Sequence, residues 1–126
     1  MIVTLSGELG SGKTTLVRGM LRALGWTLPV RSPSFTLVEH YQLASLYFYH
    51  FDFYRLEGSD EWDSTGFAEY FRPDSVVVVE WPERVSKRLS PADVAARLEH
   101  REPGRMLELQ AHTEAGEACL AQVATA

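Results

Sequence analysis

The 126-residue sequence contains a single cysteine, Cys119, and no long uninterrupted apolar run. One cysteine excludes an internal disulfide and a cysteine-rich zinc site, which makes a reducing cytoplasm the expected compartment. A membrane-spanning helix needs about 20 consecutive apolar residues, and no stretch approaches that length. The first ten residues also lack the charged leader and long apolar core of a signal peptide. We therefore expect a cytoplasmic protein without a membrane partner, in which Cys119 is a small apolar filler in a C-terminal helix.

Positive charge is also in short supply. The chain has 12 Lys and Arg residues against 17 Asp and Glu residues, and its formal net charge is −5. Binding to a nucleic-acid backbone requires a clustered basic face, so this composition argues against strong binding to nucleic acid by the chain alone. No repeat, low-complexity segment or linker divides the sequence, and a hydrophobic content of 45% is enough for one core. The prediction is a single domain over residues 1–126.

Strand-like and helical segments alternate from the first residues onward. Residues 2–5 predict a short strand, and apolar residues at helical spacing follow up to Gly25, which is typical of a C-terminal helix cap. Further strand-like runs cover residues 35–41, 46–54 and 75–80, and weaker helical material covers residues 59–71. This alternation predicts an α/β sheet rather than a helical bundle or a β-sandwich.

The C-terminal part of the sequence is ambiguous. The segment from Ser90 to Asp93 has the features of a helix start: a capping hydroxyl, a proline at the first helical position and an acid in the first turn. Residues 94–99 instead alternate in the manner of a strand, residues 103–104 (Pro-Gly) signal a turn, and residues 106–109 suit a return strand. These local signals leave a helix and a hairpin as alternatives.

A complete phosphate-loop motif, G-x-x-x-x-G-K-[ST], covers residues 7–14 directly after the first predicted strand. Its glycines allow backbone N–H groups to approach phosphate oxygens, and the following helix directs its positive end at the same phosphates. Lys13 would reach the β- and γ-phosphates, and the Thr14 hydroxyl would ligate magnesium. The motif and its place between a strand and a helix predict that the protein binds a nucleoside triphosphate.

Two carboxylates are candidates for the chemistry beside this loop. Glu80 ends a run of four valines, which is typical of a central strand buried on both faces. Phosphate-loop enzymes place a second carboxylate at the end of such a neighbouring strand. Asp52 lies among aromatic residues, and because a buried unpaired carboxylate is costly, it should have a partner: magnesium, or else Arg55 or His50. His50 is interpreted as a hydrogen-bonded structural histidine, and Trp81 as a residue that lies against the nucleotide, a partner or the core.

Four segments in this order, GELGSGKTT, SPSFTLVEHY, HFDFYRLEG and VVVVEWPER, make the sequence resemble the bacterial TsaE (YjeE) family. These are small ATPases required for making threonylcarbamoyladenosine in tRNA, and the resemblance covers about residues 2–84. It implies a phosphate-loop α/β fold with a mixed sheet flanked by helices and a C-terminal hairpin. It also implies that TsaD and TsaB are the partners, that tRNA is reached only through the complex, and that ATP hydrolysis resets the complex between turnovers.

The resemblance also implies the site residues and the cofactors, ATP and magnesium. Catalysis would involve Lys13, Asp52 and Glu80, and magnesium would be held by Thr14, Glu80 and Asp52. The implied nucleotide-binding set is Gly10, Ser11, Gly12, Lys13, Thr14, Thr15, Trp81 and Glu83. The sequence departs from the family pattern in two ways: the family has a further segment ahead of the first strand, and it usually has threonine where this chain has Ser34.

Two other classes of function remain open from the residues. A small-molecule kinase would need an acceptor pocket and a lid arginine, for which Arg84 and Arg88 are candidates. A nucleotide-switched binding module would bind ATP with negligible hydrolysis. No arginine is an obvious built-in finger, although Arg55 and Arg84 are candidates, so we expect weak ATPase activity until a partner supplies a positive charge or orders the attacking water.

Overall fold

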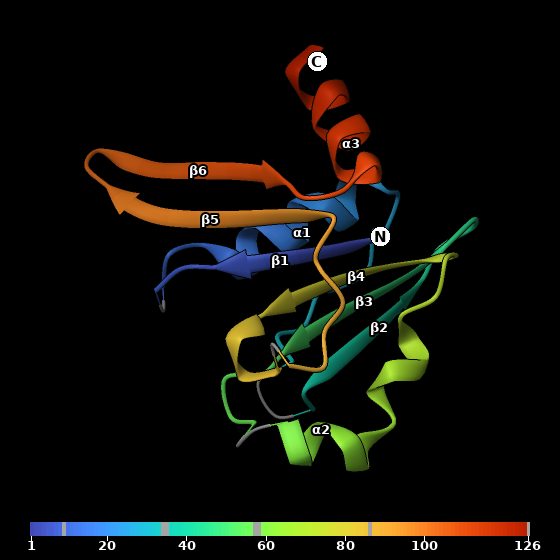
Figure 1. The fold of residues 1–126 in the computed structure, drawn as a ribbon. Helices are drawn as coiled ribbons and strands as arrows, with labels where there is room; N and C mark the ends of the chain where they lie inside the picture. Colours follow the sequence, from blue (N-terminus) through green and yellow to red (C-terminus); the bar gives the residue numbers. More distant parts are fainter. Residues whose placement is uncertain (9, 34–35, 57–58, 86, 126) are drawn as a thin grey trace.

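The computed structural model describes residues 1–8, 10–33, 36–56, 59–85 and 87–125, and its strands form one six-stranded sheet in the order β2-β3-β4-β1-β5-β6 (Figure 1). The strands are β1 (Ile2–Ser6), β2 (Val38–Gln42), β3 (Tyr47–Asp52), β4 (Ser75–Glu80), β5 (Val94–Arg101) and β6 (Gly104–Ala111). The helices are α1 (Lys13–Ala23), α2 (Ser59–Thr65) and α3 (Glu114–Thr125), with short 3₁₀ helices η1 (Phe67–Tyr70) and η2 (Pro82–Val85). The predicted α/β class with a mixed sheet is confirmed.

The sheet is parallel at its centre and antiparallel at both edges. β3, β4, β1 and β5 run parallel to one another, whereas β2 pairs antiparallel with β3 and β6 pairs antiparallel with β5. The carboxyl ends of the parallel strands therefore meet at one edge of the sheet, where open α/β sheets form their ligand sites. The phosphate loop after β1, Asp52 at the end of β3 and Glu80 at the end of β4 all lie at this edge.

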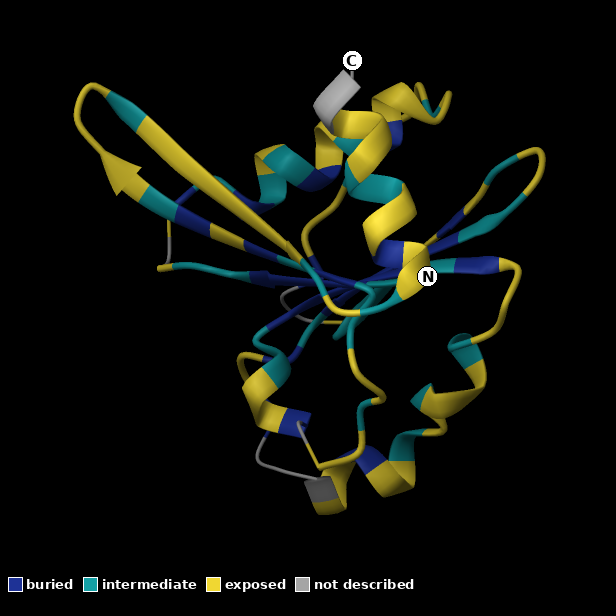
Figure 2. Ribbon diagram, turned by 45° about the horizontal axis from the view of Figure 1, so that its top comes forward, coloured by how far each residue is buried: buried dark blue, intermediate teal, exposed yellow. Residues whose placement is uncertain are grey.

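The valines of β4 pack against helices on both faces of the sheet. Val78 belongs to a core shared with Val17 and Leu21 of α1, whereas Val77 lies in a second core with Trp62 of α2. Figure 1 shows α1 and α3 on one side of the sheet and α2 on the other, and Figure 2 shows the buried residues concentrated at the centre of the sheet. Because adjacent side chains of a strand point to opposite faces, a run of valines suits a strand covered on both sides. This prediction for residues 76–79 is confirmed.

The predicted helix boundaries are close to the observed ones. α1 ends at Ala23, and Gly25 follows with a φ of 98°, so that the N–H groups of Gly25 and Trp26 bond to the carbonyls of Arg22 and Leu21. This is the pattern of a left-handed C-terminal cap, which glycine adopts readily. The helical material predicted at residues 59–71 is present as α2 and η1.

Two of the strands are shorter than the sequence predicts, and α3 is as expected. The runs predicted at residues 35–41 and 46–54 are present as β2 and β3, although residues 34 and 35 lie outside the described part of the chain. Cys119 lies in α3 and packs, partly buried, against the core on the α1 side, as predicted. In the described residues, no helix is long and apolar enough to cross a membrane.

The C-terminal hairpin implied by the family resemblance is confirmed, because β5 and β6 pair along residues 94–111. Of the two alternatives that the local signals left open for this segment, the helix start at Ser90 to Asp93 is not formed. Asp93 instead joins the starts of β1 and α3: its Oδ2 accepts the Ile2 N–H at 2.7 Å, and its Oδ1 accepts the Thr113 hydroxyl at 2.6 Å. The Thr113 hydroxyl in turn accepts the Gly116 N–H at 3.0 Å and so caps α3. Asp93 and Thr113 do use their side chains as caps. They do so where the starts of β1 and β5 meet the start of α3, and not at the start of a helix at Ser90.

The protonation of Asp93 should affect the stability of this junction. Burial alone would raise the pKa of Asp93, but the hydrogen bonds from Thr113 and from the Ile2 N–H outweigh it and lower that pKa below its ordinary value of 3.8. Because the folded-state pKa is depressed, the stabilisation is fully present above about pH 3.8 and is lost as the pH falls through the lower folded value.

We expect Asp93→Asn to lower the melting temperature at pH 7, because hydrogen bonds to a charged acceptor contribute about 1.5–3 kcal/mol each. The difference from the wild type should shrink in acid, as the wild-type carboxylate becomes protonated. Thermal unfolding followed by circular dichroism at pH 7 and at pH 3 measures both effects. Asp74→Asn is the matched control, since it removes the same charge from an exposed position beside Arg72. Equal melting of Asp93→Asn and the wild type at pH 7 would contradict the role of Asp93.

Candidate phosphate-binding site

The phosphate loop, residues 7–14, leads from β1 into α1 in a backbone conformation that requires glycine. Gly12 is the N-cap of α1 with a φ of 107°, in the left-handed region. A Cβ on Gly7 would lie 2.7 Å from the Leu98 carbonyl and 2.7 Å from the Ser11 hydroxyl, so no side chain fits there. The first turn of a helix leaves N–H groups without intrahelical partners, and these groups bind phosphate oxygens. The loop therefore combines the backbone shape and the donors of a phosphate site.

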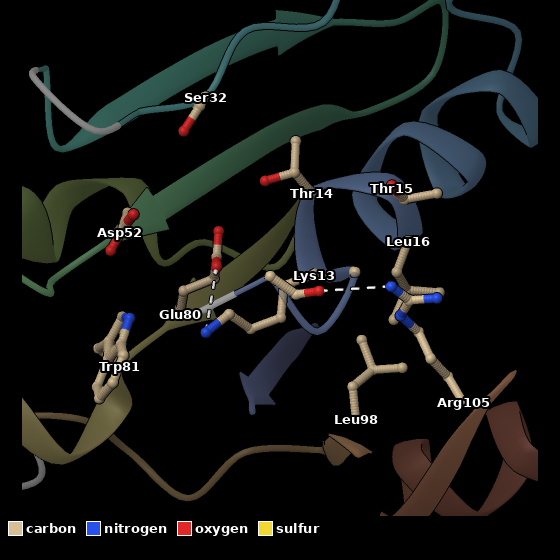
Figure 3. Close-up of a pocket in the computed structure, with 12 residues that line it drawn as sticks. Lys13, Thr14, Thr15, Leu16, Ser32, Asp52, Glu80, Trp81, Leu98 and Arg105 are labelled. Carbon is tan, nitrogen blue, oxygen red and sulfur yellow. Dashed lines mark hydrogen bonds and ion pairs between the residues drawn. The ribbon is translucent and has the colours of Figure 1, made fainter. Parts of the chain in front are cut away.

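A cavity of about 630 Å³ lies over this loop and the start of α1 (Figure 3). This is a usual volume for a small-molecule pocket, for which about 300–1,000 Å³ is typical. The lining residues come from the loop, α1, the segment between α1 and β2, the ends of β3 and β4, and the hairpin: Gly10, Gly12, Lys13, Thr14, Thr15, Leu16, Ser32, Asp52, Glu80, Trp81, Leu98 and Arg105. The fold thus gathers into one cavity every predicted site residue except Ser11 and Glu83.

Ser11 and Glu83 do not line this cavity. Ser11 is buried and its hydroxyl has no hydrogen-bond partner among the described residues, whereas Glu83 is exposed on η2. Ser34, the departure from the family pattern, lies outside the described residues, as does position 9 of the loop. Conversely, Leu98 and Arg105 line the cavity without having been predicted, because the hairpin carries no motif that marks them.

The pairing of β3 with β4 brings the two candidate carboxylates side by side. In this parallel pair Asp52 is opposite Glu80, and His50 is opposite Val78. His50 and Asp52 flank Phe51, which belongs to the core on the α2 side, so both point to the face that α1 covers. Strand periodicity and register therefore place two acids and a histidine next to the phosphate loop.

Glu80 is almost fully buried, with an exposed fraction of 4%, and two groups compensate its carboxylate. Its Oε2 lies 2.6 Å from Nε2 of His50, and its Oε1 lies 3.9 Å from Nζ of Lys13. A buried carboxylate requires such partners because burying an isolated charge is costly. The prediction that His50 is a hydrogen-bonded structural histidine is confirmed. Its partner, however, is Glu80 and not Asp52.

Lys13 extends from α1 back across the loop. Its Nζ donates a hydrogen bond to the Gly7 carbonyl at 2.6 Å and lies 4.8 Å from the centroid of the Trp81 ring. Trp81 has a φ of 57°, a left-handed conformation that is unusual for a bulky residue. This turn directly after β4 places the indole over the ammonium group, where a cation–π attraction is favourable. Trp81 is therefore a wall of the cavity, although it also packs against the core on the α2 side.

Asp52 is half-buried at the opening of the site, and its Oδ1 accepts the Tyr54 N–H at 3.0 Å. Burial raises the pKa of Asp52; the bond from Tyr54 lowers it, and the neighbouring Glu80 charge raises it again, so that the net direction is upward. An ionised Asp52 beside Glu80 is thus energetically unfavourable and favours binding of a cation. In the described part of the chain, no group of three or more His, Cys, Asp or Glu residues could hold a metal ion.

Comparison with known proteins identifies relatives that match most of this chain. The family model described as "Threonylcarbamoyl adenosine biosynthesis protein TsaE" matches residues 1–118. The tRNA threonylcarbamoyladenosine biosynthesis protein TsaE of Haemophilus influenzae is 42% identical over 116 residues, which cover 92% of this chain and 73% of that protein. Its counterpart from Bacillus subtilis is 42% identical over 88 residues, which cover 70% of this chain and 54% of that protein, about half of its length. The crystal structure of YdiB from Bacillus subtilis matches with a TM-score of 0.83 at 28% identity, covering 98% of this chain and 76% of that one.

Loss of the His50 contact should destabilise the site measurably. His50→Leu leaves the buried Glu80 carboxylate without its nearest partner, which should cost about 1–3 kcal/mol or more and lower the melting temperature. His50→Gln retains a hydrogen-bond donor and should melt at a temperature between those of the wild type and His50→Leu. His112→Leu, which removes an exposed histidine, serves as the control. Thermal unfolding compares the variants, and identical melting of His50→Leu and His112→Leu would show that the contact does not hold Glu80.

Proposed function

The chain belongs to the TsaE family, and we propose that it is a magnesium-dependent ATPase that serves the formation of threonylcarbamoyladenosine in tRNA. One observation carries the proposal: Lys13, Glu80 and Asp52 converge on a phosphate loop within one cavity. A lysine that reaches phosphate oxygens and a carboxylate at the end of the neighbouring strand are the two groups that phosphate-loop hydrolysis requires. Residues 1–126 would act together as one phosphate-loop ATPase domain.

The residues of the cavity suit ATP and magnesium. The N–H groups of the loop and of the first turn of α1, from Gly10 to Thr15, would bind the phosphates, and Lys13 would contact the β- and γ-phosphates. The Thr14 hydroxyl and the carboxylates of Glu80 and Asp52 would hold magnesium, which usually takes one or two protein carboxylates and completes its shell with water and phosphate oxygens. When bound, the metal would neutralise charge that develops on the phosphate oxygens.

Lys13 and Glu80 have further roles that follow from their contact. In the structure the Lys13 ammonium lies between the Gly7 carbonyl, the Glu80 carboxylate and the Trp81 ring. A phosphate group would compete for this ammonium, because a charge-assisted bond to phosphate is stronger than one to a neutral carbonyl. Glu80 would remain oriented by His50 and would be available to the metal or to the attacking water.

We propose TsaD and TsaB as the protein partners, with tRNA reached only through the complex they form. The net charge of −5 supports this division, since strong binding to tRNA needs a basic surface. ATP hydrolysis would reset the complex between turnovers, and nucleotide binding and partner binding would strengthen each other by linkage. A cytoplasmic location is part of the same proposal.

The main alternative is a small-molecule kinase with Arg84 or Arg88 as its lid arginine. Arg88 instead forms two hydrogen bonds of 2.9 Å with Asp63 of α2, Nε to Oδ1 and Nη2 to Oδ2. α2 lies on the face of the sheet opposite α1 (Figure 1). Arg88 is not among the residues that line the cavity over the loop. The contact with Asp63 and the family membership both favour the ATPase.

The proposal predicts slow hydrolysis by the chain alone and faster hydrolysis with its partners. Calorimetric titration with ATP and magnesium should detect binding, and adding TsaD and TsaB should raise phosphate release in a single-turnover assay. Lys13→Ala should weaken ATP binding by about tenfold or more, because it removes a charge-assisted contact with phosphate. Unchanged ATP affinity in Lys13→Ala would disprove the loop assignment. Full-rate hydrolysis without partners, or partners that neither bind nor change turnover, would disprove the partner-dependent role.

Substitution of each of the two carboxylates should distinguish an effect on thermal stability from an effect on hydrolysis. Because its environment raises the pKa of Asp52, ionised Asp52 makes the folded state less stable, so Asp52→Asn should melt at the same or a higher temperature without nucleotide. The same variant should lose magnesium-dependent hydrolysis. Glu80→Gln should weaken hydrolysis more than it weakens ADP binding. If Asp52→Asn lowers the melting temperature and leaves the magnesium dependence intact, Asp52 is a structural residue.

A further inference from the structure

His50 lies behind the cavity and acts on it through Glu80. The ring is fully buried, with an exposed fraction of 0%, and His50 is not among the residues that line the cavity. Its Nε2 lies 2.6 Å from Oε2 of Glu80, and because an ionised carboxylate oxygen can only accept, Nε2 is the donor. Among the described residues, Nδ1 of the same ring has no hydrogen-bond partner. The polar contact of this histidine is therefore directed at the Glu80 carboxylate.

This bond makes the two oxygens of Glu80 different. Oε2 is held by the buried ring, whereas Oε1 lies 3.9 Å from Nζ of Lys13, which lines the cavity. A phosphate bound to the loop would compete for the Lys13 ammonium, because a charge-assisted bond to phosphate is strong. Oε1 would then be released while Oε2 stays on His50. Glu80 is thus arranged to offer a single oxygen to a ligand in the cavity.

Asp52 is restricted in a similar way. Its Oδ1 accepts the Tyr54 N–H at 3.0 Å, a bond that lies within the turn directly after β3. Each of the two acids therefore has one oxygen occupied by a protein donor, and each can offer at most one oxygen that is free of these bonds. The two carboxylates of the cavity are built as one-oxygen ligands.

Magnesium and calcium differ in their use of carboxylates. Magnesium requires octahedral geometry and is usually held by one or two carboxylates together with water and phosphate oxygens. Calcium takes about six to eight oxygens, and often both oxygens of one carboxylate. The Thr14 hydroxyl, which lines the same cavity as the two acids (Figure 3), would add a further single oxygen. This donor set suits magnesium and withholds from calcium the two-oxygen ligand that it favours.

We propose that His50 is a positioning residue that makes Glu80 a one-oxygen ligand and thereby sets a preference for magnesium over calcium. This inference rests on the proposed ATPase function. Hydrogen-bond partners of a metal-binding carboxylate fix its orientation, and their loss typically weakens metal affinity about 10–100-fold. Loss of His50 should weaken binding with magnesium more than with calcium, because a released Glu80 can turn both oxygens to the larger ion.

Calorimetric titration with a non-hydrolysable ATP analogue, in magnesium and in calcium, measures this preference as a ratio of two affinities. The wild type should favour magnesium by about tenfold or more, and His50→Leu should bring the ratio close to one. His50→Gln should keep the preference, because its amide nitrogen takes the place of Nε2. His50→Asn carries its amide nitrogen at the place of Nδ1 and should resemble His50→Leu. His112→Leu, which changes an exposed histidine, should behave like the wild type.

The contrary outcomes are distinct. An unchanged ratio in His50→Leu overturns the inference, as does a wild type that binds the analogue equally well with both ions. Equal ratios in His50→Gln and His50→Asn also overturn it, and this comparison decides the matter if His50→Leu does not fold. An equal loss with both ions, together with a lower melting temperature, indicates a structural residue and overturns it too. Failure of the wild type to bind the analogue with either ion disproves the proposed function itself.

Discussion

The buried carboxylate of Glu80 is the constraint on which the rest of the site depends. It ends a strand that is covered on both faces, so water cannot compensate its charge, and the protein must supply partners. His50 comes from the adjacent parallel strand and Lys13 from the helix after the phosphate loop. The Glu80 carboxylate thereby connects β3, β4 and the phosphate loop. Glu80 and Lys13 are also residue types that phosphate-loop enzymes use for their chemistry. Under the proposed function, stability and hydrolysis are coupled at this point of the fold, because a substitution that removes a partner of Glu80 would disturb both.

Because β1 lies between β4 and β5, different kinds of residue line the two sides of the phosphate loop. On the β4 side lie the acids and Trp81, which under the proposed function would serve the metal and the reacting phosphate. On the β5 side lies the hairpin, which contributes an apolar wall at Leu98 and the cation Arg105. Neither side alone would suit a polyphosphate. Asp52 and Glu80 repel its negative charge, and Arg105 has no group that could activate an attacking water. The mixed sheet, with parallel strands at its centre and a hairpin at its edge, brings the two sides together over one helix terminus.

Two features of the site are unfavourable for folding and are typical of functional positions. Trp81 adopts a left-handed backbone conformation, which costs energy for a residue with a large side chain. Asp52 has a raised pKa because it is half-buried beside another carboxylate, so its ionised form lowers the stability of the protein. Strain and repulsion of this kind are retained where a ligand relieves them. Their occurrence on neighbouring strand ends, at the edge of the sheet that carries the phosphate loop, is the pattern expected of a site that binds a metal and a nucleotide.

The sequence by itself determined the features that depend on local backbone and periodicity. The phosphate loop follows from glycines in conformations that other residues rarely adopt, and the doubly buried β4 follows from its valines. Local signals left a helix and a hairpin open from Ser90 onward, since a capping hydroxyl and an acid can equally join two strands to another helix. Only the tertiary structure decided that His50 partners Glu80, 30 residues away, and that Arg105 reaches Gly10 across 95 residues. Such contacts depend on strand order and register, which are set by packing of the whole sheet and leave no mark in any short segment of the chain.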